Sequence, residues 1–276
     1  RRDEEREKRQ RDLQNRAQGI SIDFIIGYLD CLLQRQFPDQ YTDETTFEDL
    51  RDLIWGDFGN LLETPVDFLG HATMINPADG LPGVSLRDAI AQRFPGHVNK
   101  ATIFLSWSWR YKVKDLIATL REYHMKDPAP RFVWICFFCN VQRQWLSGQQ
   151  QDGVAAFGDM VQYIGRVVSV VDTYKAATTI YLKRLWPVYE IFVARQSGVE
   201  ISVALMTEAK EDLKKETFEG LKSSLEVDVM NATATLPADE AMITAAIEGS
   251  DGGSANVNKV VRRLFVAMLG ELLMQD

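Results

Sequence analysis

One short stretch of the sequence combines residue types that could bind a nucleotide. Ser106–Arg110, with the sequence SWSWR, brings two indoles, two hydroxyls and a guanidinium together directly after an apolar run. Indoles stack on rings such as adenine or nicotinamide, and a guanidinium binds phosphate, so this segment predicts a ligand-binding loop. An alternative is that Trp107 and Trp109 cover the edge of a sheet against the N-terminal helices.

A second candidate is the pair Cys136 and Cys139, which has a C-x-x-C spacing. A redox pair needs its first cysteine at the start of a helix, where the thiolate is stabilised. Here the pair lies in or just past a predicted strand, which would point the two thiols to opposite faces. There is no second cysteine pair for zinc, and the three histidines are scattered and expected at the surface. The sequence therefore predicts no metal site.

The elements that must position these residues are a strand, a helix and a second strand. Thr102–Leu105 and Phe132–Phe138 are continuous apolar runs, which is typical of strands covered on both faces of a parallel sheet. Apolar residues at helical spacing predict a helix over 113–123, and the Pro-rich segment 127–130 ends it. A right-handed crossover would bring both strand ends to one edge of the sheet, where α/β folds bind ligands.

The part of the chain before residue 99 is predicted to be helical. Residues 1–18 are dense in charge of both signs, so as a helix they would form a solvated arm. Residues 19–98 are predicted to form a helical subdomain that packs on the α/β part. Its helices are expected to begin at Ser21, Thr45 or Thr46, Thr64-Pro65, and Ser85.

From residue 99 onward strands and helices alternate, which predicts a doubly wound α/β domain over 99–276. Further strands are expected at Val167–Val171, Val199–Leu205 and Leu225–Val229. Helices are expected at Val154–Gly165, Leu185–Gln196, Glu208–Leu221, Asp239–Glu248 and Asn256–Met274. Asn140–Gly153 is expected to be a polar loop.

The composition narrows the classes of function. The 276 residues carry a net charge of −8, which argues against nucleic acid as the partner. Three cysteines are too few for a disulfide scaffold, which favours an intracellular, reducing compartment and leaves the organelle open. No apolar run approaches the roughly 20 residues that span a bilayer, so no transmembrane segment is expected.

Three segments occur in the order and spacing of a known family: FLSWSWRYKVKDLIATL, FVWICFFCNVQRQW and YLKRLWPVYEIF. Together they resemble Toll/interleukin-1-receptor (TIR) domains, and they look most like the TIR-like proteins of algae and other microbial eukaryotes. The resemblance covers roughly residues 99–275, including the tail from Val229 to Ile247. It implies a flavodoxin-like fold with a central five-stranded parallel sheet.

The resemblance also implies a catalytic residue, Glu190. In enzymatic TIR domains a Glu on the helix after the third strand supports cleavage of NAD to nicotinamide and ADP-ribose or cyclic variants. The segment WPVYE, residues 186–190, matches its setting. A carboxylate stabilises the positive charge that develops on the ribose, and a nearby helix N-terminus favours the ionised carboxylate. The resemblance implies NAD as the substrate and no cofactor. It also implies a pocket formed by Ser106, Trp107, Trp109, Arg110 and Trp186.

The sequence departs from the family at the presumed cleft. Trp107 and Cys136 stand where His and Asp are common, and Pro187 stands where Cys is common. The substitutions at Trp107 and Cys136, the charged arm and the acidic surface favour a second hypothesis, in which the chain is a non-catalytic TIR-like subunit. Its helix faces would then bind copies of itself or other protein subunits. A thiol oxidoreductase based on Cys136 and Cys139 is a third alternative.

Overall fold

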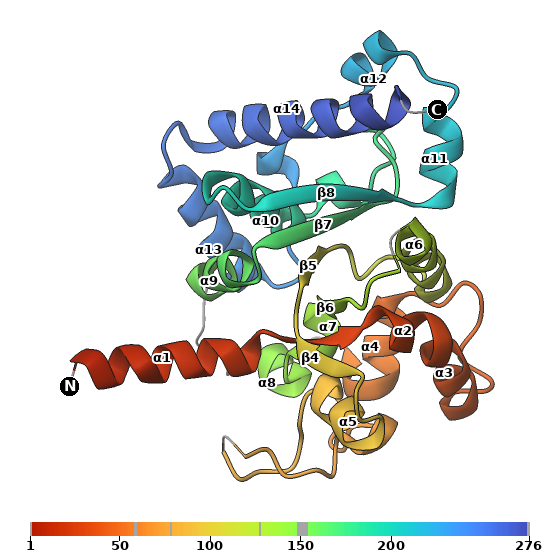
Figure 1. Ribbon diagram of the computed structural model, residues 1–276, viewed down its shortest axis with the longest axis vertical. Helices are drawn as coiled ribbons and strands as arrows, with labels where there is room; N and C mark the ends of the chain where they lie inside the picture. Colours follow the sequence, from red (N-terminus) through yellow and green to blue (C-terminus); the bar gives the residue numbers. More distant parts are fainter. Residues whose placement is uncertain (1, 58–59, 78, 127, 148–153, 275–276) are drawn as a thin grey trace. The chain divides into compact units, whose positions relative to one another are not determined.

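A computed structural model describes residues 2–57, 60–77, 79–126, 128–147 and 154–274 (Figure 1). The chain divides into two compact units: unit 1 comprises residues 1–104 and 112–152, and unit 2 comprises residues 105–111 and 153–276. This division does not coincide with the boundary at residue 99 that the sequence suggested. Both units contain strands and helices, so the predicted α/β class is confirmed.

The sheet of unit 1 contains two short strands that the sequence analysis did not predict. Its members are β1 (Gln18–Ser21), β4 (Val98–Lys100), β5 (Ile103–Ser106) and β6 (Phe132–Trp134). β5 and β6 are parallel, whereas β1 pairs antiparallel with both β4 and β6. A Cβ at Gly19 would lie 2.6 Å from the carbonyl oxygen of Val133, so only glycine fits this close approach of two strands. β1 and β4 show no apolar alternation in the sequence, which explains why they were missed.

Capping residues explain where three helices of unit 1 begin. Ser21, Thr46 and Ser85 each accept a hydrogen bond from a backbone N–H one turn later, so three of the four expected helix starts are confirmed. The start expected at Thr64-Pro65 is wrong, because residues 64–67 are irregular and a 3-10 turn, η2, begins only at Phe68. The helical elements of unit 1 are α1 (Arg2–Arg16), α2 (Ile22–Phe24), η1 (Ile25–Leu29), α3 (Asp30–Gln36), α4 (Phe47–Trp55), η2 (Phe68–Gly70), α5 (Leu86–Arg93), α6 (Val113–Lys126), α7 (Cys136–Cys139) and α8 (Gln142–Leu146). The strands β2 (Gly56–Asp57) and β3 (Asn60–Leu61) form a separate hairpin.

Unit 2 is built on two long parallel strands. β7 (Arg166–Val171) and β8 (Glu200–Leu205) pair in register from Arg166–Glu200 to Val171–Leu205. The last two residues of β5, Leu105 and Ser106, also belong to this unit. The helical elements are α9 (Val154–Ile164), η3 (Tyr181–Lys183), α10 (Leu185–Gln196), α11 (Thr207–Leu213), α12 (Phe218–Ser224), η4 (Val229–Asn231), α13 (Pro237–Glu248) and α14 (Gly253–Leu273). Helices α9 and α10 contact β7, and α14 contacts β8 (Figure 1).

The hydrogen-bonded strand order is β4-β1-β6-β5-β7-β8, so the sheet is mixed and six-stranded rather than five-stranded and parallel. The expected fifth strand at Leu225–Val229 is wrong. This segment is extended and its residues alternate between buried and exposed, which explains the prediction. However, the N–H of Val229 donates to the side chain of Asn258, and the segment leads into η4 rather than into a strand ladder.

Three other boundaries differ from the prediction. β6 ends at Trp134, and Cys136–Cys139 forms the one-turn helix α7 instead of continuing the strand. The charged helix expected over Glu208–Leu221 is two helices, because the Thr217 side chain caps the start of α12. The predicted loop Asn140–Gly153 contains α8, and its residues 148–153 lie outside the described part of the chain.

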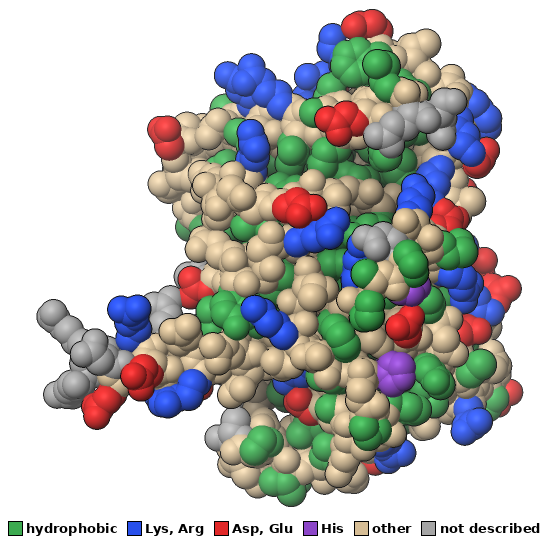
Figure 2. All heavy atoms as spheres, in the orientation of Figure 1, with side chains coloured by type: hydrophobic (Ala, Val, Ile, Leu, Met, Phe, Trp, Pro, Cys, Tyr) green, Lys and Arg blue, Asp and Glu red, His purple; other side chains and the backbone are tan. Residues whose placement is uncertain are grey.

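The N-terminal arm forms a helix, as predicted. Most described side chains of α1 are exposed, and Figure 2 shows both signs of charge along it and over the visible face of the molecule. Among the described residues, no helix is both long enough and apolar enough to cross a bilayer.

Candidate functional site

Ser106 and Glu190 lie in direct contact within unit 2. Ser106 is the last residue of β5 and is fully buried, and Glu190 is a buried residue of α10 that is 8 % exposed. The hydroxyl of Ser106 donates a hydrogen bond of 2.6 Å to Oε2 of Glu190. Two residues that the sequence analysis named separately are therefore joined at the C-terminal end of a parallel strand, where α/β folds bind ligands.

A third residue, Tyr181, completes this group. Its hydroxyl oxygen lies 2.6 Å from Oγ of Ser106, and the side chain is fully buried on η3. Burial raises the pKa of Tyr181, and the negative charge of Glu190 adds to this effect. Tyr181 therefore keeps its proton at physiological pH and is available as a hydrogen-bond donor.

Burial raises the pKa of Glu190 to about 7, while the hydrogen bond from Ser106 acts in the opposite direction. The sequence analysis expected the N-terminus of the helix to favour the ionised form. That expectation is wrong because α10 begins at Leu185, so Glu190 lies in the second turn, where the dipole is weak and burial dominates. The result is a carboxyl group that changes its charge near neutral pH, which is typical of residues in functional sites.

Asp172 fixes the loop that carries Tyr181. It follows β7 directly, and its carboxylate accepts hydrogen bonds from the backbone N–H groups of Ile180 (2.7 Å) and Tyr181 (3.1 Å). The hydroxyls of Thr179 and Tyr111 also donate to it, each over 3.3 Å. The sequence analysis missed Asp172 and Tyr181 as site residues. The available signal was an acid placed directly after an apolar strand, at the same edge of the sheet as Ser106.

The loop after Ser106 is only partly exposed. Trp107 and Ser108 are buried, Trp109 is half-buried, and Arg110 is exposed. Tyr111 is buried and donates a hydrogen bond of 2.9 Å to the carbonyl oxygen of Val170 at the end of β7. Of the predicted pocket residues in this loop, Trp109 and Arg110 are therefore the ones that reach solvent.

Trp186 has a different set of neighbours from Ser106. Its indole N–H donates to Oδ2 of Asp239 on α13 over 3.1 Å, and its ring lies 4.5 Å from that of Phe157 on α9. These contacts connect α10 to two neighbouring helices of unit 2. Burial raises the pKa of Asp239, and the hydrogen bond from Trp186 lowers it.

Cys136 and Cys139 do not point to opposite faces of a strand, because α7 puts them one helical turn apart. Burial raises the pKa of the Cys139 thiol to about 11, which opposes formation of the thiolate that redox chemistry requires. No group of three or more His, Cys, Asp or Glu side chains among the described residues could hold a metal ion.

His71 is buried, contrary to the surface position expected for the histidines. Its Nε2 accepts a hydrogen bond of 3.0 Å from the indole N–H of Trp55, and its Nδ1 lies 2.8 Å from the carbonyl oxygen of Phe68. Nδ1 therefore carries the proton of a neutral ring. Leu69, between Phe68 and His71 in the sequence, has a φ of 60°, so the contact of His71 with Phe68 also holds a strained backbone segment.

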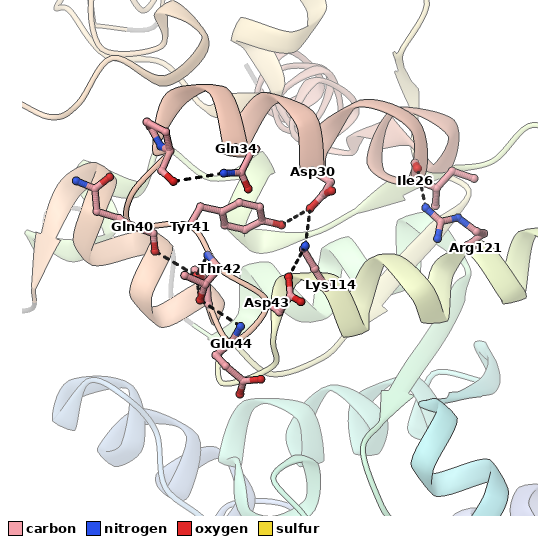
Figure 3. A network of polar contacts seen from close by, with 12 residues as sticks. Ile26, Asp30, Gln34, Gln40, Tyr41, Thr42, Asp43, Glu44, Lys114 and Arg121 are labelled. Carbon is pink, nitrogen blue, oxygen red and sulfur yellow. Dashed lines mark hydrogen bonds and ion pairs between the residues drawn. The ribbon is translucent and has the colours of Figure 1, made fainter.

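A second group of polar side chains lies in unit 1 (Figure 3). The hydroxyl of Tyr41 donates to Oδ1 of Asp30 over 2.7 Å, and Lys114 pairs with Asp43 and lies 4.0 Å from Asp30. Arg121 donates to the carbonyl oxygen of Ile26 over 3.1 Å. These contacts connect α6 to η1, α3 and the following loop, which is a structural role.

A hollow of about 460 Å³ lies in unit 1 and is lined by polar side chains that include Glu44, Asp49 and Asp52. Asp49 already accepts hydrogen bonds from the backbone and hydroxyl of Thr46 as part of a capping box. Glu44 pairs with Lys112. The acids here serve the local fold, so the group around Glu190 is the stronger candidate site.

No protein-family model, curated protein or solved structure matches this chain.

Proposed function

We propose that residues 99–276 form a TIR-like domain that cleaves NAD at the bond between nicotinamide and ribose, with Glu190 as the catalytic residue. The observation that carries this proposal is the hydrogen bond between Ser106 and Glu190. It joins an acid whose pKa is raised to about 7 to the loop that bears Trp109 and Arg110. An aromatic ring, a cation for phosphate and an acid for the ribose are the groups that this reaction needs.

The chemistry requires the ionised carboxylate. When the C–N bond breaks, its electron pair goes to the nicotinamide nitrogen, and positive charge develops on the ribose ring. The carboxylate of Glu190 stabilises that charge. Water then adds to the ribose carbon and releases a proton, which gives ADP-ribose. Glu190 is 8 % exposed, so binding of NAD at its carboxylate requires a local movement of the residues that cover it.

The strand order offers independent support. The order β6-β5-β7-β8 follows the 2-1-3-4 arrangement of flavodoxin-like sheets, in which ligands bind beyond the C-terminal ends of the first and third strands. Ser106 ends β5, Asp172 follows β7, and Glu190 lies on the next long helix. This is also the element on which the resemblance to TIR domains puts the catalytic Glu.

The test is release of nicotinamide by purified protein at high concentration, because TIR domains often work only when assembled. Glu190→Gln removes the negative charge but keeps the size of the side chain, so it should abolish release. Glu219→Gln is the matched control, since its side chain is 80 % exposed on α12 and it should leave release unchanged. No release by the wild-type protein, or equal release by Glu190→Gln, removes the enzyme hypothesis.

A second function is a non-catalytic TIR-like subunit of a larger assembly. The burial of Glu190 beside Ser106 and Tyr181 favours it, because a carboxyl group that is 8 % exposed is poorly accessible to a substrate. Light scattering on the wild-type protein and on Glu190→Gln, combined with the measurement of nicotinamide release, separates the two functions, because an enzyme releases nicotinamide when it is assembled. A subunit assembles equally with either side chain and releases no nicotinamide.

A further inference from the structure

We infer that Tyr181 is a positioning residue that acts on Glu190 through Ser106, so that the three side chains form one hydrogen-bonded chain with a direction. Both links are 2.6 Å long, and all three side chains are buried. A role of this hydrogen-bonded chain in catalysis rests on the proposed function of Glu190. Its existence does not, because the direction of the hydrogen bonds can be measured without NAD.

The direction follows from counting protons. A serine hydroxyl has one proton, and an ionised carboxylate can only accept. When Glu190 is ionised, Ser106 must therefore give its proton to Glu190, and the hydroxyl of Tyr181 must donate to Ser106. Each bond polarises the next, so the proton of Tyr181 strengthens the bond that stabilises the charge on Glu190.

Protonation of Glu190 allows the chain to run the other way. The carboxylic acid can then donate to Ser106, and Ser106 to Tyr181. Tyr181 in turn needs a new acceptor, and the hydroxyl of Ser169 is available beside it. Ser169 is fully buried on β7, and its hydroxyl makes no hydrogen bond to another described residue, so it is free to accept one from Tyr181. The hydrogen bonds can therefore run from Tyr181 to Glu190 when Glu190 is ionised, or from Glu190 to Ser169 when Glu190 is protonated.

Asp172 explains why Tyr181 stays in place during this change. The two backbone N–H groups that bind its carboxylate belong to Ile180 and to Tyr181 itself. The charge of Asp172 also acts on the neighbouring Tyr111, whose hydroxyl donates to it. Tyr111 and Asp172 are therefore titratable groups beside the hydrogen-bonded chain, and the hydroxyl of Tyr181 contacts Ser106.

The experiment is a titration of the Glu190 side chain by NMR with ¹³C-labelled glutamate, assigned by the signal that Glu190→Gln loses. Ser106→Ala removes the bond to the charged form, so the midpoint should rise by about one unit or more. Tyr181→Phe removes only the polarising donor, so the midpoint should rise by roughly 0.3 unit. Tyr174→Phe is the matched control, because Tyr174 is also buried in unit 2 but its hydroxyl faces Glu216. It should leave the midpoint unchanged.

An unchanged or lowered midpoint in Tyr181→Phe overturns the inference, and so does an unchanged midpoint in Ser106→Ala. Thermal unfolding of each variant shows whether it is folded, and an unchanged midpoint in Ser106→Ala overturns the inference even if Tyr181→Phe fails to fold. A rise in both midpoints without any release of nicotinamide would support the chain and remove the proposed enzyme. The two proposals can therefore fail separately.

Discussion

The hydroxyl of Ser106 donates to Oε2 of Glu190 over 2.6 Å, although the two residues are 84 positions apart in the sequence. The influences that set the pKa of Glu190 are burial and this hydroxyl, and neither supplies a positive charge. Burial of a carboxyl group without a cation makes its ionisation costly. Above neutral pH, the ionised carboxylate of Glu190 therefore lowers the stability of unit 2.

The first prediction concerns this cost. The pKa of Glu190 is about 7 in the folded chain, against an ordinary value of 4.5, so the folded chain retains a proton that the unfolded chain loses between these two pH values. The contribution of Glu190 to stability is thus present below pH 4.5 and is lost as the pH rises to about 7. This raised pKa corresponds to a loss of ~3 kcal/mol in stability above neutral pH.

Glu190→Gln should remove this dependence of stability on pH. We expect the variant to unfold at a higher denaturant concentration than the wild-type protein at pH 8, with the difference shrinking towards pH 4.5. Denaturant unfolding monitored by circular dichroism measures it. A variant that is less stable than the wild-type protein at pH 8 would show that the ionised carboxylate stabilises unit 2.

The second prediction concerns His71 in unit 1. Burial lowers its pKa, so the folded chain holds the ring neutral while the unfolded chain takes up a proton below about pH 6.5. Stability from this residue is therefore full above that pH and falls as the solution becomes more acidic. In His71→Gln the stability should be lower at pH 8, because the contacts with Trp55 and Phe68 are altered, but it should vary less between pH 8 and pH 5.5. An equally steep loss in the variant contradicts this account.

The third prediction concerns the loop held by Asp172. Asp172→Ala removes the acceptor of two backbone N–H groups and two hydroxyls, so we expect a loss of about 2–4 kcal/mol in the free energy of unfolding. Asp212→Ala is the matched control, since it breaks only the surface pair with Lys175 and should change stability little. Equal effects of the two substitutions in denaturant unfolding would show that Asp172 does not organise the loop.

The sequence allowed a good prediction of the elements that carry strong local signals. Ser21, Thr46 and Ser85 predicted three helix starts because side-chain capping is a local interaction. The run Val167–Val171 predicted β7 because a strand covered on both faces is continuously apolar. The range of α10, Leu185–Gln196, was predicted correctly as well.

The errors come from features that depend on distant partners. Gln18–Ser21 forms a strand because it pairs with β4 and β6. The residues of this segment do not themselves indicate that pairing. Leu225–Val229 has the alternation of a strand but lacks a strand ladder. At the site, Ser106 and Glu190 were both named, but the raised pKa of Glu190 and the part played by Tyr181 depend on burial and on contacts between distant segments.

The fourth prediction concerns Arg110, the exposed cation of the loop. If it contacts the phosphates of NAD, Arg110→Ala should raise KM for NAD about tenfold and leave kcat nearly unchanged, because charge-assisted hydrogen bonds are worth roughly 1.5–3 kcal/mol. Arg195 is an exposed cation in the last turn of α10. Arg195→Ala serves as the matched control and should leave KM and kcat unchanged. A fall in kcat alone would indicate that Arg110 acts on the reacting bond instead.

The most direct test of the central claim is the rate of nicotinamide release from NAD between pH 5.5 and pH 8.5. Because the ionised form of Glu190 is the one that stabilises the ribosyl cation, we predict that the rate rises with pH through about 7 and then levels off, and that Glu190→Gln shows no release at any pH. A rate that falls through this range, or release by Glu190→Gln equal to that of the wild-type protein, would contradict the account.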